Sequence, residues 1–137
     1  MLTGLRVLLA DDHKGMLERV KTLLNPEFEI VGAVDNGQAL VDAAKELNPD
    51  VLVVDISMPL LNGIDAVRQI RESGGKGRVI FLTVHEDPDM VPACLDAGAL
   101  GFVVKSRLAS DLIPAIQLAL ADHTFVSPTL PWEGTVG

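Results

Sequence analysis

The chain has 137 residues, of which 48% are hydrophobic and 22% charged, as is usual for one packed domain. Its formal net charge is −8, so this segment repels nucleic-acid phosphates and anionic membrane surfaces, which argues against direct binding to either. The first residues lack the apolar region of a signal peptide, and no apolar run approaches the length of a membrane span. We therefore expect a cytoplasmic protein.

Short apolar runs rich in Val, Ile and Leu recur along the chain. Most do not alternate with polar residues, which is typical of strands buried on both faces of a parallel sheet. The runs are, in chain order, Leu5–Ala10, Phe28–Val34, Val51–Val54, Val79–Leu82 and Leu100–Val104.

Helical patterns separate these runs. The first two amphipathic stripes end at Asn25-Pro26 and Asn48-Pro49. Asn62 is the predicted N-cap of a third helix, and Pro88 is the predicted first residue of a fourth. The fifth helix carries an apolar stripe formed by Leu112, Ile113, Ile116 and Leu120.

Strict alternation of five strands and five helices predicts a doubly wound α/β fold. We expect a five-stranded parallel sheet of the flavodoxin-like kind, with strand order 2-1-3-4-5 and five helices. The domain should cover residues 1–122, where the pattern stops. Residues 123–137 are interpreted as a linker stub or a loose tail.

Polar side chains follow four of the predicted strands, at the edge of the sheet where α/β proteins bind ligands. They are Asp11, Asp12, Asp55, Thr83, His85, Glu86 and Lys105. A hard divalent cation such as Mg²⁺ relieves the repulsion between three carboxylates, while an ammonium and a hydroxyl group suit a bound phosphoryl group. Asp55, on the central third strand, is the best placed nucleophile toward phosphorus.

Each of these residues also has an ordinary structural interpretation. Asp11, Asp12 and Asp55 are common residue types in turns and helix caps, Thr83 in strands, and Lys105 on solvated surfaces. The functional interpretation rests on their joint position, because all of them fall at the same end of successive strands.

Other chemistry has little support. The residues His13, His85 and His123 have no metal-ligand spacing and are interpreted as surface residues. Cys94 is interpreted as a small core residue. The sequence has neither a P-loop motif nor a strand-linked dinucleotide-binding motif, so nucleotide binding is not predicted.

Four segments together resemble the signature blocks of response-regulator receiver domains. They are RVLLADDH at 6–13, VLVVDISMPLLNGID at 51–65, VIFLTVHED at 79–87 and GALGFVVKS at 98–106. The resemblance covers about residues 5–121. The sequence at residues 83–87 and 98–99 is similar to that of the NarL/FixJ (LuxR-type) subgroup, whose members usually carry a C-terminal DNA-binding domain.

The resemblance implies a role for each matching residue. Asp55 is the phosphoacceptor, Asp12 and Asp55 ligate Mg²⁺ directly, Asp11 acts through water, and the backbone carbonyl of Ser57 completes the protein ligands. Lys105 pairs with phosphoryl oxygens. The remaining matches are the switch pair Thr83 and Phe102 and the loop-shaping pair Pro59 and Gly63. The phosphoryl donor is a phosphohistidine on a sensor histidine kinase.

The expected function is therefore that of a phosphorelay receiver, which catalyses only its own phosphorylation and dephosphorylation. We expect a phosphorylation-dependent homodimer and an output that controls transcription. Three departures accompany this expectation. Phe102 stands where Tyr is common, and Pro92 and Pro114 fall early in the fourth and fifth predicted helices, whose first turns they should shorten or distort.

Two alternatives remain at this point. A Mg²⁺-dependent phosphatase of the haloacid-dehalogenase kind needs D-x-D after its first strand, whereas this chain has Asp11-Asp12. A pseudo-receiver that is never phosphorylated is disfavoured because the required side chains are present. Finally, Ser57 and His85 are expected to flank the path of the hydrolytic water, where neither is suited to orient it.

Overall fold

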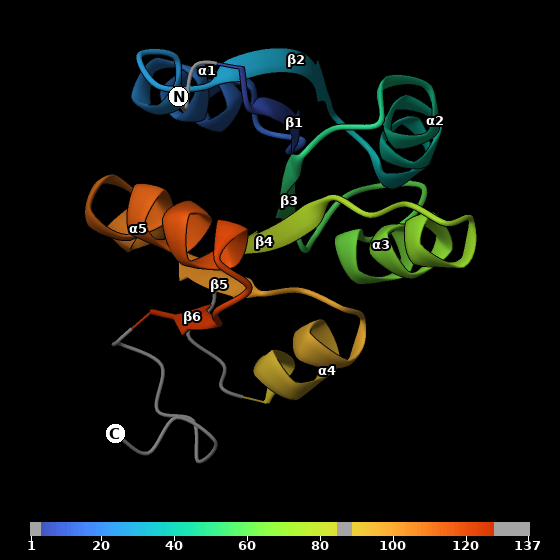
Figure 1. The fold of residues 1–137 in the computed structure, drawn as a ribbon. Coiled ribbons are helices and arrows are strands. Elements are labelled where there is room, and N and C mark those ends of the chain that lie inside the picture. The colour runs from blue at the N-terminus through green and yellow to red at the C-terminus, as the bar shows by residue number, and fades with distance from the viewer. Residues whose placement is uncertain (1–3, 85–88, 128–137) are drawn as a thin grey trace.

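Six parallel strands form the centre of the structure, a computed structural model that describes residues 4–84 and 89–127 (Figure 1). The strands are β1 (Arg6–Ala10), β2 (Glu29–Val34), β3 (Val51–Asp55), β4 (Arg78–Thr83), β5 (Gly101–Val104) and β6 (Phe125–Val126). They lie in the order β2-β1-β3-β4-β5-β6. The five predicted strands and their order are confirmed, with each end within one residue of the prediction.

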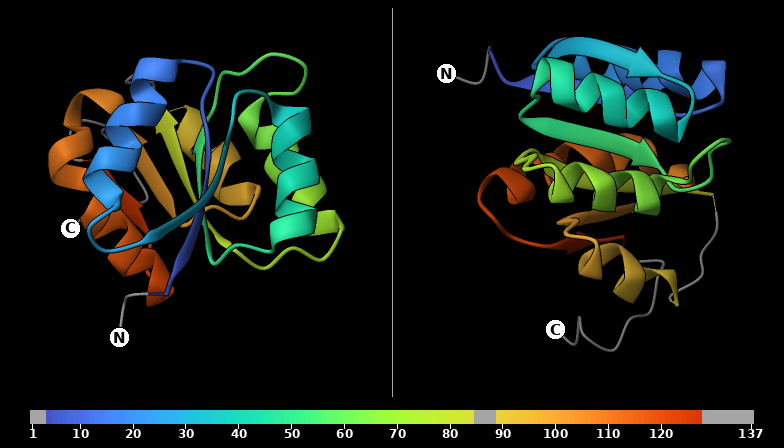
Figure 2. Two further views of the ribbon diagram at one scale, coloured as in Figure 1. Left: turned by 90° about the horizontal axis from the view of Figure 1, so that it is seen from above. Right: turned by 90° about the vertical axis from the view of Figure 1, so that its right-hand side faces the viewer.

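Helices cover both faces of this sheet (Figure 2). They are α1 (Lys14–Leu24), α2 (Gly37–Leu47), α3 (Gly63–Glu72), α4 (Met90–Asp96) and α5 (Leu108–Leu120), with a 3₁₀ turn, η1 (Lys105–Arg107), before α5. One apolar core lies between the sheet and α2, α3 and α4, and a second lies between the sheet and α1 and α5. The near-continuous burial of β1, β3, β4 and β5 follows from this two-sided cover.

Local sequence signals fix where the helices begin. The predicted N-cap Asn62 accepts a hydrogen bond from the backbone N–H of Asp65 at 2.9 Å, and Asn36 caps α2 through the N–H of Ala39 at 2.8 Å. Helix α4 is short, as expected for a helix with Pro92 in its first turn. Pro88, the predicted first residue of that helix, lies outside the described residues.

The position of Pro114 in its helix was predicted wrongly. Helix α5 begins at Leu108, directly after η1, so Pro114 lies in the middle of the helix rather than near its start. Pro114 is exposed, and so is Ser110 one turn before it. Pro114 has no N–H to donate to the Ser110 carbonyl, but this carbonyl lies on the exposed side of α5, where water can donate instead. The helix therefore continues to Leu120.

Residues 125–127, which lie in the segment interpreted as a linker stub or a loose tail, belong to the sheet instead. Phe125 and Val126 form β6, which pairs with Gly101 and Phe102 of β5, and Ser127 is fully buried. A two-residue strand leaves no periodic pattern in a sequence, so its pairing depends on the open edge that β5 offers.

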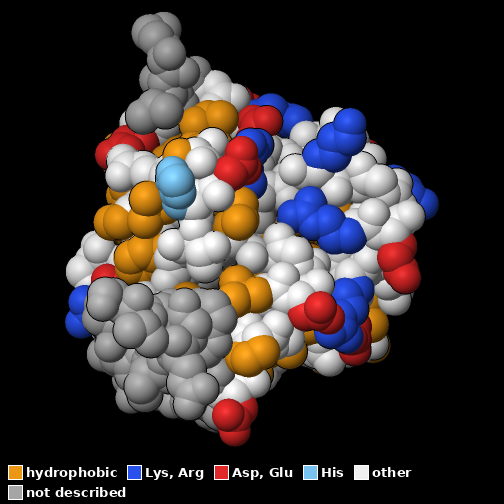
Figure 3. Space-filling model, turned by 60° about the horizontal axis from the view of Figure 1, so that its bottom comes forward, with side chains coloured by type: hydrophobic (Ala, Val, Ile, Leu, Met, Phe, Trp, Pro, Cys, Tyr) orange, Lys and Arg blue, Asp and Glu red, His pale blue; other side chains and the backbone are white. Residues whose placement is uncertain are grey.

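The surface is mixed in character. On the face that includes α4 and β6, hydrophobic side chains lie in several small groups between charged ones (Figure 3). The large hydrophobic side chains that are exposed within the described residues are Leu60, Val84 and Leu118. None of the described helices is both long and apolar enough to span a membrane.

Candidate functional site

Three carboxylates lie together at the carboxyl ends of β1 and β3, which are neighbours in the sheet. Asp11 and Asp12 follow β1, and Asp55 is the last residue of β3. Oxygen atoms of these residues and a ring nitrogen of His13 all lie within 4.8 Å of one another. The structure therefore brings together the three acids that the strand order places at this edge.

The three acids differ in their access to water. Asp11 and Asp55 are buried, with 2% and 4% of their surface exposed, whereas 33% of the Asp12 side chain is exposed. The cluster is therefore open to solvent on the side of Asp12.

Lys105 lies at the first position after β5 and extends back over the acids. Its Nζ is 2.7 Å from Oδ2 of Asp11 and 3.5 Å from Oδ2 of Asp55, and its side chain is 5% exposed. The interpretation of Lys105 as a solvated surface residue is therefore wrong. Its single positive charge compensates the two buried carboxylates only in part, so the cluster retains a negative charge that a divalent cation would balance.

The surroundings of Asp55 favour its protonated form. Burial, followed by repulsion from Asp11, raises the pKa of Asp55 from 3.8 to about 6, although the charge of Lys105 and the N–H of Ser57 act in the opposite direction. That N–H donates to Oδ1 of Asp55 at 3.3 Å. Positive charge added beside this carboxyl group would lower its pKa and so favour the ionised, nucleophilic form.

The loop after β3 places its backbone close to Asp55. The N–H of Gly63 donates to the carbonyl of Ile56 at 2.8 Å, and a Cβ atom on Gly63 would clash with the backbone oxygen of Asp55. The carbonyl of Pro59 accepts hydrogen bonds from Leu61 at 2.8 Å and Gly37 at 3.4 Å, which ties the loop to the start of α2. The loop-shaping roles predicted for Gly63 and Pro59 are consistent with these contacts.

Thr83 lies on β4, the strand beside that of Asp55, and Phe102 lies on β5, one strand further along the sheet. Thr83, at the end of β4, is 2% exposed and pairs with Val104. Phe102 is fully buried in the core beneath α4, together with Val91 and Cys94. Cys94 is a buried core residue as expected, and burial raises the pKa of its thiol to about 12.

The contacts of His13 were not predicted. Its Nδ1 lies 3.0 Å from an oxygen of Asp12 and 3.2 Å from one of Asp11, although 69% of its side chain is exposed. The histidines of the sequence are not spaced as metal ligands, so nothing in the sequence indicated this contact. The proximity of His13 to the acids comes from the tight turn into α1. His123 is exposed as expected, whereas His85 and Glu86 lie outside the described residues.

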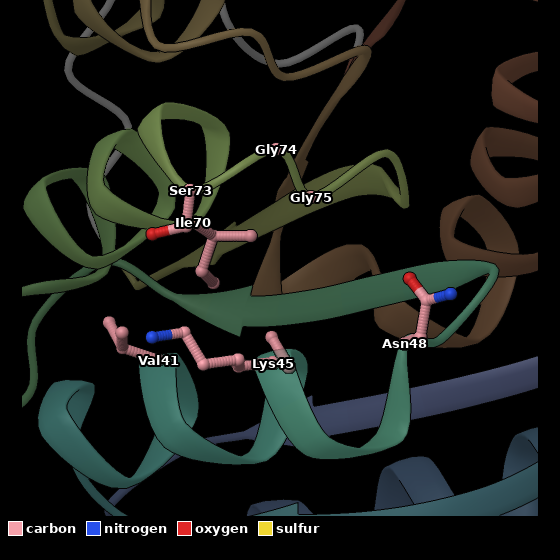
Figure 4. Close-up of a pocket in the computed structure, with 8 residues that line it drawn as sticks. Val41, Lys45, Asn48, Ile70, Ser73, Gly74 and Gly75 are labelled. Carbon is pink, nitrogen blue, oxygen red and sulfur yellow. The ribbon is translucent and has the colours of Figure 1, made fainter.

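Another depression lies between α2 and α3 (Figure 4). Its lining includes Val41, Ile70 and Lys45 but no carboxylate. It therefore lacks the carboxylates of a cation site, which lie together at the carboxyl ends of β1 and β3.

A family model described as the response regulator receiver domain matches residues 7–117. The chain belongs to this family. The receiver is 32% identical over 126 residues to the transcriptional regulatory protein DegU of Brevibacillus brevis, an alignment that covers 90% of this chain and 53% of DegU. This receiver thus spans about half the length of that relative. The assignment excludes the haloacid-dehalogenase alternative.

Solved structures of receivers share the fold. A LuxR-family response regulator from Aurantimonas sp. SI85-9A1 superposes with a TM-score of 0.84 and 31% identity, covering 90% of this chain and 89% of that one. The CheX–CheY–BeF3–Mg complex from Borrelia burgdorferi gives a TM-score of 0.79 and 25% identity, covering 84% and 88%. The resemblance to the LuxR-type subgroup and the flavodoxin-like fold are thereby confirmed.

Proposed function

We propose that the receiver accepts a phosphoryl group on Asp55 from a sensor histidine kinase, in the presence of Mg²⁺. The observation that carries the proposal is the placement of Asp55, a buried carboxylate held beside Asp11 and within 3.5 Å of the Lys105 ammonium. A nucleophilic carboxylate beside fixed positive charge and a cation site is the arrangement that phosphoryl transfer requires.

In this reaction an oxygen of Asp55 attacks phosphorus, and the bond from phosphorus to the imidazole nitrogen of the donor breaks. The electron pair of that bond goes to the nitrogen, so the kinase regains a neutral histidine after proton uptake from water. Lys105 balances the negative charge on the transferred phosphoryl oxygens. The Ser57 N–H orients the attacking carboxylate.

The donor set fits Mg²⁺, because carboxylate oxygens on one exposed and two buried acids suit a hard divalent cation. Asp12 and Asp55 would bind it directly, Asp11 through water, and the Ser57 carbonyl would complete the protein ligands. When bound, Mg²⁺ supplies positive charge that neutralises the phosphoryl oxygens. The Borrelia CheX–CheY complex contains BeF3 and Mg²⁺, which supports this assignment by similarity.

The test is to incubate the receiver with Mg²⁺ and phosphoramidate, and to follow its intact mass. The wild type should gain one phosphate, and Asp55→Asn should gain none. The matched control is Asp35→Asn, which removes an exposed carboxylate outside the site. Uptake by Asp55→Asn at the wild-type yield would refute Asp55 as the acceptor, and no uptake by the wild type would favour a pseudo-receiver.

The proposed output is control of transcription through a segment that follows the receiver, and the proposed location is the cytoplasm. The boundary expected near residue 122 is moved beyond Ser127, because β6 pairs with β5. Support comes from DegU, a transcriptional regulator nearly twice as long as the match. We further propose a phosphorylation-dependent homodimer, with Thr83 and Phe102 carrying the change to the face formed by α4, β5 and α5. Sedimentation with and without beryllofluoride tests this, and identical behaviour of the two forms would contradict it.

The acyl phosphate should decay slowly, because Ser57 and His85 are unsuited to orient an attacking water. Ser57 is exposed beside Asp55, as this proposal requires. Replacing Ser57 with Asn and His85 with Glu should speed phosphate loss by about tenfold or more, the usual gain from one positioned group. Decay no faster than that of the wild type would remove these side chains from control of the water.

A further inference from the structure

Ser127 joins the segment that leaves the domain to β5, the strand directly before Lys105. Its backbone N–H donates to the carbonyl of Phe102 at 3.0 Å, and its Oγ accepts a hydrogen bond from the N–H of Val104 at 3.1 Å. Val104 directly precedes Lys105 in the chain. The Ser127 side chain thus takes the place that a further β6 carbonyl would occupy in the ladder with β5.

The other side of Ser127 is held by α5. The Ser127 hydroxyl donates to Oδ2 of Asp111 at 2.8 Å, and Ser127 itself is fully buried. Asp111 is also buried and accepts two hydrogen bonds from Arg107, from Nε at 2.9 Å and from Nη2 at 3.3 Å. Ser110 adds another from its exposed hydroxyl at 2.9 Å.

This network has a fixed direction of donation. Burial alone would raise the pKa of Asp111, but hydrogen bonds from Arg107, Ser127 and Ser110 outweigh it and lower the pKa. An ionised Asp111 can only accept, so it holds the Ser127 proton and leaves the Oγ lone pairs directed toward Val104. The hydroxyl therefore connects α5 to β5 in one defined geometry.

We infer that Ser127 is a positioning residue for Lys105, and that it couples the phosphorylation site to the segment leaving the domain. The inference rests on the proposed function. The two adjacent residues Val104 and Lys105 are held at different places. The Val104 N–H is fixed by Ser127, while the Lys105 ammonium faces Asp11 and Asp55. A phosphoryl group that holds Lys105 more firmly therefore also strengthens the Ser127 contacts.

Linkage makes the effect reciprocal, since two sites that favour each other do so by the same factor in both directions. Removing the Ser127 hydroxyl should weaken binding of a phosphoryl mimic at Asp55. Binding of the mimic should in turn slow exchange of the Val104 and Ser127 amide hydrogens.

The experiment uses beryllofluoride with Mg²⁺ as the probe, on the full chain. Its apparent affinity is measured for the wild type, Ser127→Ala and Ser110→Ala. The last variant is the matched control, because it removes a hydrogen bond to the same Asp111 carboxylate and leaves the Val104 contact intact. Hydrogen exchange at the Val104 and Ser127 amides is followed in the wild type with and without the probe.

We expect Ser127→Ala to lose at least about fivefold in affinity, the lower end of ordinary coupling between sites, and Ser110→Ala to stay within about twofold. The two amides should gain protection on binding. Equal loss in both variants, no loss in Ser127→Ala, or unchanged or faster amide exchange would overturn the inference. Failure of the wild type to bind beryllofluoride and to take up phosphate would instead refute the proposed function, and this inference with it.

Discussion

Replacing Asp55 with Asn should stabilise the apo protein, and the gain should grow with pH. The pKa of Asp55 is raised in the fold from 3.8 to about 6, so the unfolded chain loses this proton at lower pH than the folded chain does. Ionised Asp55 therefore destabilises the native state above pH 6, and the effect disappears below pH 3.8, where both states hold the proton. An amide carries neither the charge nor the titration.

The size of the effect follows from linkage. At about 1.4 kcal/mol for each pKa unit, the difference between Asp55→Asn and wild type should be about 1 kcal/mol at a pH of about 4.5. It should reach about 3 kcal/mol near a pH of about 7.5. The pKa of about 6 already includes the attraction between Asp55 and Lys105, so the loss of that contact needs no separate allowance.

Urea unfolding at several pH values, in the absence of divalent cations, measures the difference. Asp35→Asn is the control, since it removes the same charge from an exposed position. A stability gap between Asp55→Asn and wild type that stays constant or narrows as the pH rises would refute the reasoning about Asp55.

Other predictions concern the same edge of the sheet. Gly63→Ala should cost about 2 kcal/mol or more in unfolding free energy, because the new Cβ meets the Asp55 carbonyl and approaches Val54 Cγ1 to 2.9 Å; an unchanged urea midpoint would contradict this. Mg²⁺ at about ten times its Kd should stabilise the wild type by about 1.4 kcal/mol but have little effect on Asp12→Asn, as measured by thermal melts. Asn62→Ala should cost about 1 kcal/mol through loss of the α3 cap, and a loss below a few tenths would argue against the cap.

Much of the fold was predictable because strands buried on both faces carry a continuous apolar signal. The same signal located Asp11, Asp55 and Lys105, since acids and an amine directly after such strands must meet at one edge. What the sequence could not supply were contacts set by tertiary structure. The position of His13 over the acids depends on the turn into α1, and the burial of Ser127 depends on the open side of β5.

Strand β6 also has a consequence for the behaviour of shortened chains. Gly101–Val104 of β5 is buried and apolar, and β6 covers the side of β5 that faces away from β4. A chain ended at residue 122 would expose this strand as an unpaired edge, which is a template for strand addition between molecules. We expect such a chain to aggregate at concentrations where a chain ended after Ser127 remains monomeric, so the practical boundary of the folded unit lies beyond the last helix.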